Sequence, residues 1–158
     1  MQAEASAEHR WLQRLVGDWR YESAGEAGPG EPPVHDEGTE SVRALGGVWV
    51  VCEAKSKADD GSASIMTLGY DPGRKRFVGT FIGSMMTFLW LYEGELDAAG
   101  TTLVLESKGP SFAEEGQTAK YRDTMEMRSD DHRIFTSSYL ADDGSWHPFM
   151  TTHYRRTR

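Results

Sequence analysis

A chain of 158 residues is long enough to bury a core, and we expect one domain over residues 1–158. Its 17 lysines and arginines against 25 aspartates and glutamates give a net charge of −8, which disfavours nucleic acid as a partner. The single cysteine, Cys52, excludes an intrachain disulfide, and no apolar run is long enough for a membrane-spanning helix. The first residues also lack the basic and apolar segments of an export signal, so we expect a cytoplasmic protein.

One helix is predicted near the amino end, over about residues 6–16. Ser6 is a suitable N-cap, and Trp11, Leu12, Leu15 and Val16 recur at a period near 3.6. Gly17 then ends the helix.

From residue 18 onward the pattern changes to the alternation that is typical of half-buried strands. Short turns rich in Asp and Gly separate the alternating runs, and no crossover helix interrupts them. Ten strands are predicted, at about 18–24, 37–45, 48–57, 62–70, 76–82, 88–96, 102–108, 119–129, 132–140 and 145–155. Because ten hairpin-linked strands would otherwise leave two exposed edges, we predict an all-β fold: a ten-stranded antiparallel up-and-down β-barrel over about 18–156, with the helix closing one end.

The loops sort by length between the two ends of such a barrel. Tight turns fall at the end that also receives the helix and the last residues, which we call the floor. The long stretches 25–36, 83–87 and 109–118 fall at the opposite end, the mouth. The last strand returns to the floor, which places Arg155 or Arg156 within reach of Trp19.

The helix followed by Gly17-Asp18-Trp19, with an arginine at the end of the last strand, is similar to the arrangement in lipocalins and other calycins. More narrowly, the chain resembles an uncharacterised bacterial lipocalin-like family, catalogued as domain of unknown function 1579. The residues that carry this resemblance are 38–41 (GTES), 66–72 (MTLGYDP), 77–85 (FVGTFIGSM), 92–94 (YEG) and 121–123 (YRD). The resemblance covers nearly the whole chain and implies the barrel fold, but it implies no activity.

Strand parity predicts a lumen lined with aromatic and methionine side chains. Such a lumen suits a small, largely apolar molecule, although the same side chains could simply fill the core. The predicted ligand-binding residues are Met85, Met86, Trp90, Tyr121, Asp123, Tyr139 and His147.

Asp123 is the most unusual of these residues, because its parity with Tyr121 places a carboxylate in an apolar wall. A structural ion pair with an arginine or histidine would explain it. Alternatively, Asp123 orients a polar group of a ligand or acts as a general acid or base, a role for which His147 is the other weak candidate.

The five histidines show no metal-binding spacing, so no metal site is predicted. A haem needs only one axial histidine, and the haem-binding nitrobindins are also ten-stranded barrels, so His153 or His147 could serve. However, residues 20–24 (RYESA) replace the glycine-rich repeat of that family, and no cofactor is identified.

Three functions therefore remain open. The leading hypothesis is a protein that binds a small apolar molecule inside the barrel. The others are an enzyme that uses Asp123 or His147, and a packed barrel that acts through protein contacts, for example as a homodimer.

Overall fold

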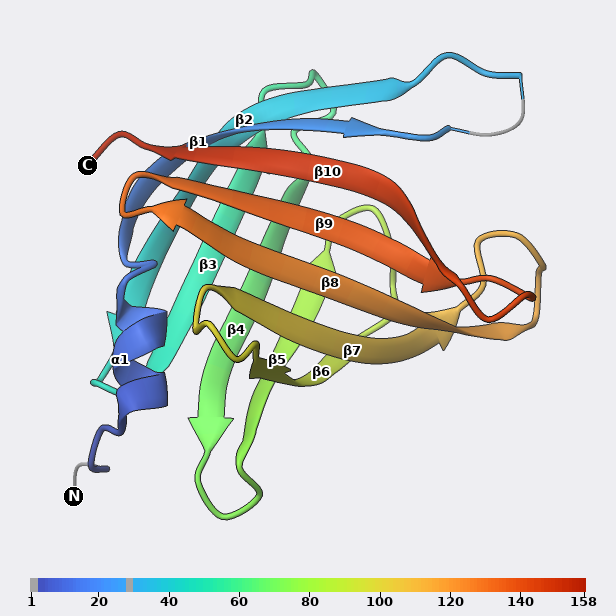
Figure 1. The fold of residues 1–158 in the computed structure, drawn as a ribbon. Coiled ribbons are helices and arrows are strands. Elements are labelled where there is room, and N and C mark those ends of the chain that lie inside the picture. Colours follow the sequence, from blue (N-terminus) through green and yellow to red (C-terminus); the bar gives the residue numbers. More distant parts are fainter. Residues whose placement is uncertain (1–2, 28–29) are drawn as a thin grey trace.

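The computed structural model describes residues 3–27 and 30–158, and within them ten antiparallel strands form one closed barrel (Figure 1). The strands follow one another around the barrel in sequence order, and β1 pairs with β10 to close it. Their bounds are β1 Gly17–Gly25, β2 Val34–Leu45, β3 Trp49–Ser56, β4 Ala63–Asp71, β5 Arg76–Gly83, β6 Trp90–Leu96, β7 Thr102–Pro110, β8 Thr118–Ser129, β9 His132–Leu140 and β10 Trp146–Arg156. The predicted fold class is confirmed.

The helix α1 spans Ala7–Gln13 and lies across the floor of the barrel (Figure 1). Ser6 and His9 cap it reciprocally: the His9 amide donates to Ser6 Oγ, and the Ser6 amide donates to His9 Nδ1. The helix ends three residues earlier than predicted. The amides of residues 14–16 bond to carbonyls three residues back, so the chain tightens into turns before β1 begins.

Side chains of α1 seal the floor. Leu12 is completely buried, and Trp11 Nε1 donates to the Gly100 carbonyl over 2.9 Å. On the other side of the helix, His9 Nε2 lies 2.9 Å from the Tyr70 carbonyl oxygen. The helix is thereby tied to the β4–β5 and β6–β7 ends of the barrel wall.

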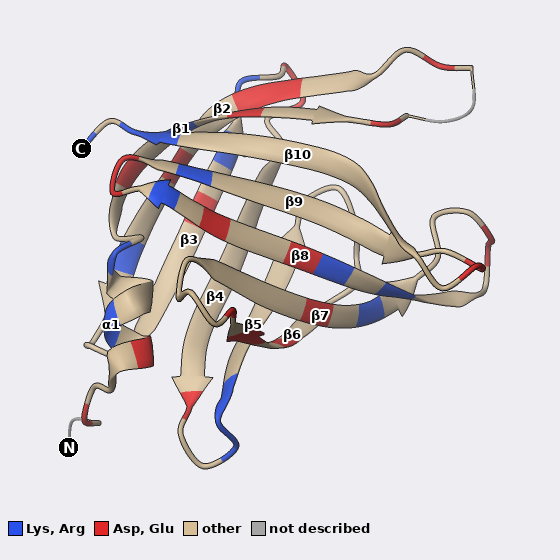
Figure 2. Ribbon diagram, viewed as in Figure 1, with Lys and Arg blue, Asp and Glu red and all other residues tan. Residues whose placement is uncertain are grey.

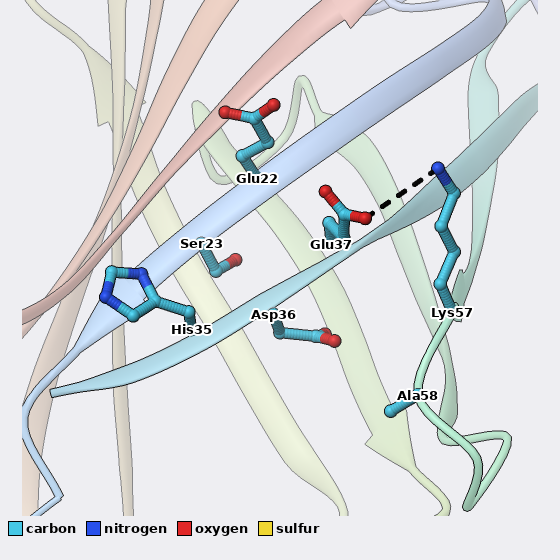
Figure 3. A pocket seen from close by; sticks show the side chains of 7 residues that line it. All are labelled: Glu22, Ser23, His35, Asp36, Glu37, Lys57 and Ala58. Carbon is cyan, nitrogen blue, oxygen red and sulfur yellow. Dashed lines mark ion pairs between the residues drawn. The ribbon is translucent and has the colours of Figure 1, made fainter. Parts of the chain in front are cut away.

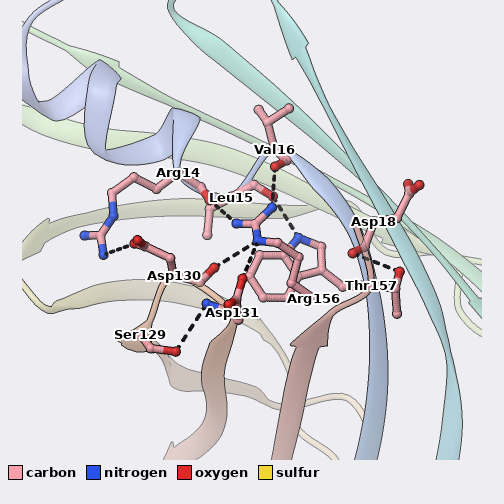
Figure 4. A network of polar contacts seen from close by, with 10 residues as sticks. Arg14, Leu15, Val16, Asp18, Ser129, Asp130, Asp131, Arg156 and Thr157 are labelled. Atoms are coloured by element: carbon pink, nitrogen blue, oxygen red, sulfur yellow. Dashed lines mark hydrogen bonds and ion pairs between the residues drawn. The ribbon is translucent and has the colours of Figure 1, made fainter.

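Arg156, at the end of β10, joins the helix, β1 and the β8–β9 turn (Figure 4). Its guanidinium lies 4.3 Å from the centre of the Trp19 ring and donates to the carbonyls of Val16, Arg14 and Asp130. The predicted contact between a terminal arginine and Trp19 is confirmed for Arg156.

The lumen is more polar than predicted. Leu68, Leu103 and Leu105 give β4 and β7 an apolar inner face, as expected. The wall formed by β9, β10, β1 and β2 instead buries polar side chains, among them Arg133, Glu40 and Thr152. Alternation shows which residues point inward, but it does not make each of them apolar.

The ladder between β6 and β7 is short. It joins Glu93–Leu96 to Leu103–Glu106, whereas Trp90–Tyr92 pair only with β5 and Ser107–Pro110 only with β8. On the mouth side of this ladder, β6 and β7 are therefore not paired with each other in the described chain. We call this part of the wall the β6–β7 seam.

In the described part of the chain, no helix is long and apolar enough to cross a membrane.

Candidate functional site

Seven rings meet at the mouth of the barrel and form what we call the mouth cluster. They come from four strands and two loops: Phe88, Trp90, Phe112, Tyr121, Tyr139, His147 and Phe149. Trp90 meets Tyr121 edge to face, with ring centres 5.2 Å apart, and both rings are buried. Phe112, from the β7–β8 loop, lies over them and stays 66% exposed. The cluster covers the inside of the barrel with aromatic surface.

The structure brings four of the seven predicted residues into this cluster: Trp90, Tyr121, Tyr139 and His147. Tyr121 is fixed by its hydroxyl, which donates to the Pro110 carbonyl over 2.7 Å. Tyr139 packs against the His147 ring at 4.9 Å, and His147 Nε2 lies 3.0 Å from a carboxylate oxygen of Glu26 at the rim.

The two predicted methionines lie in the β5–β6 loop. Met86 supports the mouth cluster, because its sulfur lies 2.9 Å from Nε1 of Trp90. Met85 is 57% exposed and rests on Gly83, outside the mouth cluster.

Asp123 lies further inside, on β8. Its carboxylate accepts a hydrogen bond of 2.5 Å from the Tyr92 hydroxyl, and Ser137 lies directly opposite on β9. Burial raises the pKa of Asp123, while hydrogen bonds from Tyr92 and Ser137 act against that shift. No arginine, lysine or histidine in the described chain forms an ion pair with it, so the ion pair suggested by the sequence is not formed.

Asp123 and Tyr154 are inward-facing residues that are only partly buried. Both side chains are surrounded by the barrel wall, yet each residue keeps part of its surface accessible to water. Because both side chains point inward from their strands, water reaches this part of the lumen. The lumen is therefore not completely filled by side chains, and its accessible part reaches a carboxylate.

Arg133, on β9, is a fully buried cation. It pairs with Glu40, and its guanidinium lies 3.8 Å from the Tyr154 ring centre and 4.6 Å from that of Trp19. Its Nε and Nη1 atoms have no hydrogen-bond partner. Burial raises the pKa of the neighbouring Cys52 thiol, so this cysteine is a neutral core side chain.

A separate pocket of about 440 Å³ opens beside the β1–β2 ribbon near the mouth (Figure 3). Glu22, Asp36, Glu37, His35 and Lys57 line it, and Glu37 pairs with Lys57. None of the seven predicted residues belongs to it. Most of its lining residues are charged and the pocket is open to solvent, which does not suit an apolar ligand, so the lumen is the better candidate site.

The predicted site residues omit four residues that the structure places in or beside the site: Phe88, Phe112, Phe149 and Tyr92. Phe112 stands alone in a loop, where no periodicity reveals its direction. The β9–β10 register shifts between Pro148 and Met150, so simple alternation could not place Phe149. Only the structure shows that the Tyr92 hydroxyl reaches Asp123 across β7.

The histidines do not fit a haem inside the barrel. His153 is exposed on the outer face, where its Nδ1 lies 3.0 Å from Nε2 of His132. His147 sits at the rim beside Glu26. In the described residues, no group of three potential ligands could hold a metal ion.

The closed barrel, the floor helix and the arginine packed on Trp19 define a lipocalin-like β-barrel protein. Residues 4–156 match the family described as "Protein of unknown function (DUF1579)", and the chain belongs to that family. No curated protein matches it.

Two solved structures show the same fold at low sequence identity. Rv2717c from M. tuberculosis superposes with a TM-score of 0.67 at 15% identity, covering 98% of this chain and all of the other. The S-type phycobiliprotein lyase CPES from Guillardia theta gives a TM-score of 0.58 at 13% identity, covering 98% of this chain and 94% of that one. At these identities the likeness establishes the barrel alone.

Proposed function

We propose that this protein binds a small, largely apolar molecule inside the barrel, beneath the mouth cluster. The observation that carries the proposal is the enclosed but accessible surface at Asp123 and Tyr154. An apolar wall of leucines and methionines flanks this space, and aromatic rings cover it, which is the composition of many ligand pockets. The floor is sealed by α1, so the ligand enters at the mouth end.

Native mass spectrometry of protein purified from its own host tests the proposal, together with the visible absorption spectrum. We expect a reproducible extra mass that disappears on denaturation. A bare chain would not by itself exclude a weak ligand, so the same preparation is titrated with a neutral solvatochromic dye.

A pair of variants on β9 decides whether the dye enters the lumen. Ser137→Leu fills the space beside Asp123, whereas Thr136→Leu adds the same side chain on the opposite face of the strand. We expect Ser137→Leu to abolish dye binding while Thr136→Leu keeps it, both with cooperative thermal unfolding. Equal binding by the two variants would refute a lumen site.

The enzyme alternative keeps Asp123 and His147 as weak candidates for a general acid or base. It predicts turnover that Asp123→Asn abolishes without loss of binding. The packed barrel that acts through protein contacts, the homodimer and the cytoplasmic location also stay predictions, as does the single domain over 1–158. The mass of the intact assembly tests the dimer in the same experiment.

A further inference from the structure

Asp123 is an accessible charge inside the barrel, and no cation in the described chain pairs with it. Its two partners, the hydroxyls of Tyr92 and Ser137, are neutral. A buried carboxylate is costly unless it is paired or protonated, and two hydroxyls compensate only part of that cost. The missing partner of this carboxylate is a positive charge.

The other lumen charges do not provide it. Arg133 is committed to Glu40 and held between the rings of Trp19 and Tyr154. Asp36 accepts from the hydroxyls of Tyr21 and Ser56, so it adds a second carboxylate without a cation. The inner wall of the described barrel therefore carries more negative than positive charge.

Arg133 is the rival candidate for ligand recognition, because its Nε and Nη1 have no hydrogen-bond partner. These atoms are buried against aromatic faces and, unlike Asp123, are not accessible from the internal space. Moreover, Glu40 already balances the charge of Arg133. An anionic ligand would place a second negative charge beside Glu40, so the geometry favours a cation at Asp123.

The route to Asp123 also suits a cation. The mouth loops 26–33, 57–62, 84–89, 111–117 and 141–145 carry eight carboxylates and one basic side chain: Glu26, Glu31, Asp59, Asp60, Glu114, Glu115, Asp142 and Asp143 against Lys57. Figure 2 shows acidic segments on these loops, whereas the floor end carries both acidic and basic segments. Beneath the loops, the mouth cluster offers aromatic faces, which attract cations.

We propose that the lumen ligand is an organic amine, whose ammonium group pairs with Asp123 while its apolar body occupies the lumen beneath the mouth cluster. The inference rests on the proposed function and names the ligand class of the same site. The ammonium replaces the absent counter-ion, keeps the hydrogen bond from Tyr92, and lies beside aromatic rings.

Three probes of equal chain length test the inference: dodecylamine, dodecanol and dodecanoate, each titrated near neutral pH by calorimetry. A charge-assisted pair in a partly enclosed site predicts that the amine binds about tenfold or more tightly than the alcohol. Asp123→Asn should reduce amine affinity by about tenfold while changing dodecanol affinity by less than about twofold. Glu126→Gln, which removes a carboxylate from the opposite face of β8, is the matched control and should preserve the amine preference.

The outcomes separate the two proposals. If dodecanol binds as well as the amine, if dodecanoate binds best, or if Asp123→Asn keeps the preference, the amine inference is wrong and the lumen site stands. If none of the probes binds, or if Ser137→Leu leaves their binding unchanged, the lumen site itself fails.

Discussion

Arg133 illustrates the cost of keeping a charge in this barrel. It is only 1% exposed, and among the described residues Glu40 is the carboxylate that pairs with it. Removing one member of a buried ion pair leaves the other uncompensated, which typically costs about 3–5 kcal/mol. We therefore expect Arg133→Met to lower the free energy of unfolding by about that amount, and Glu40→Leu combined with Arg133→Met to recover most of it. Urea unfolding measures both, and a loss below about 1 kcal/mol in the single variant would contradict this account.

Asp123 makes the ligand-free protein sensitive to pH in the opposite sense from a salt-bridged acid. Because burial raises the pKa of Asp123, the folded state holds the proton more tightly than the unfolded state does. This contribution to stability is complete below the ordinary carboxyl pKa and is lost as pH rises through the raised value.

We expect Asp123→Asn to raise the stability of the ligand-free protein near neutral pH, with the difference vanishing below the ordinary carboxyl pKa. Thermal melts of the two proteins across this range test the sign. A variant that is less stable at neutral pH would show that the ionised carboxylate is favourably solvated in the lumen.

At the scale of elements, the β7–β8 loop carries Phe112 over Trp90 and Tyr121. The Phe112 ring is largely exposed, so its removal should change the free energy of unfolding by less than about 1 kcal/mol. Phe112→Ala should nevertheless speed the release of a lumen-bound dye several-fold in stopped-flow measurements, because it uncovers the space below.

Two controls accompany this variant. Phe112→Tyr keeps the ring and should keep slow release, and Leu89→Ala removes an exposed apolar side chain outside the mouth cluster. If Leu89→Ala speeds release as much as Phe112→Ala, the Phe112 ring is not the cover.

The elements also show where sequence reasoning succeeds and where it stops. Alternation identified all ten strands and the inward direction of Trp90, Tyr121 and Asp123, because a strand has a period of two. It underestimated the polar wall, although Arg133 alternates with Phe135 and Glu40 with Val42 in the sequence. Pairings across the lumen, such as Arg133 with Glu40, join residues 93 positions apart and depend on how the barrel closes.

The whole molecule has a negative mouth and a net charge of −8. The electric field of the negative mouth would speed the association of a cationic ligand, and salt would weaken this effect. We expect the association rate of dodecylamine to fall several-fold between about 20 and 500 mM salt, while that of dodecanol changes little. Rates measured by tryptophan fluorescence test this, and parallel salt dependence for both probes would exclude electrostatic steering.

Because the barrel is closed, every strand pairs with two neighbours, but the number of paired positions differs from strand to strand. β6 has five paired positions with β5 and only four with β7, whereas β8 and β9 share eight. Local opening begins where the fewest ladder bonds must break, so the amides along the β6–β7 seam should exchange hydrogen with solvent before those of the other strands.

Since β6 also carries Trp90 and Tyr92, the same opening separates the mouth cluster and frees the hydroxyl that holds Asp123. The strand expected to open first thus carries Trp90 and Tyr92, two side chains of the proposed binding site.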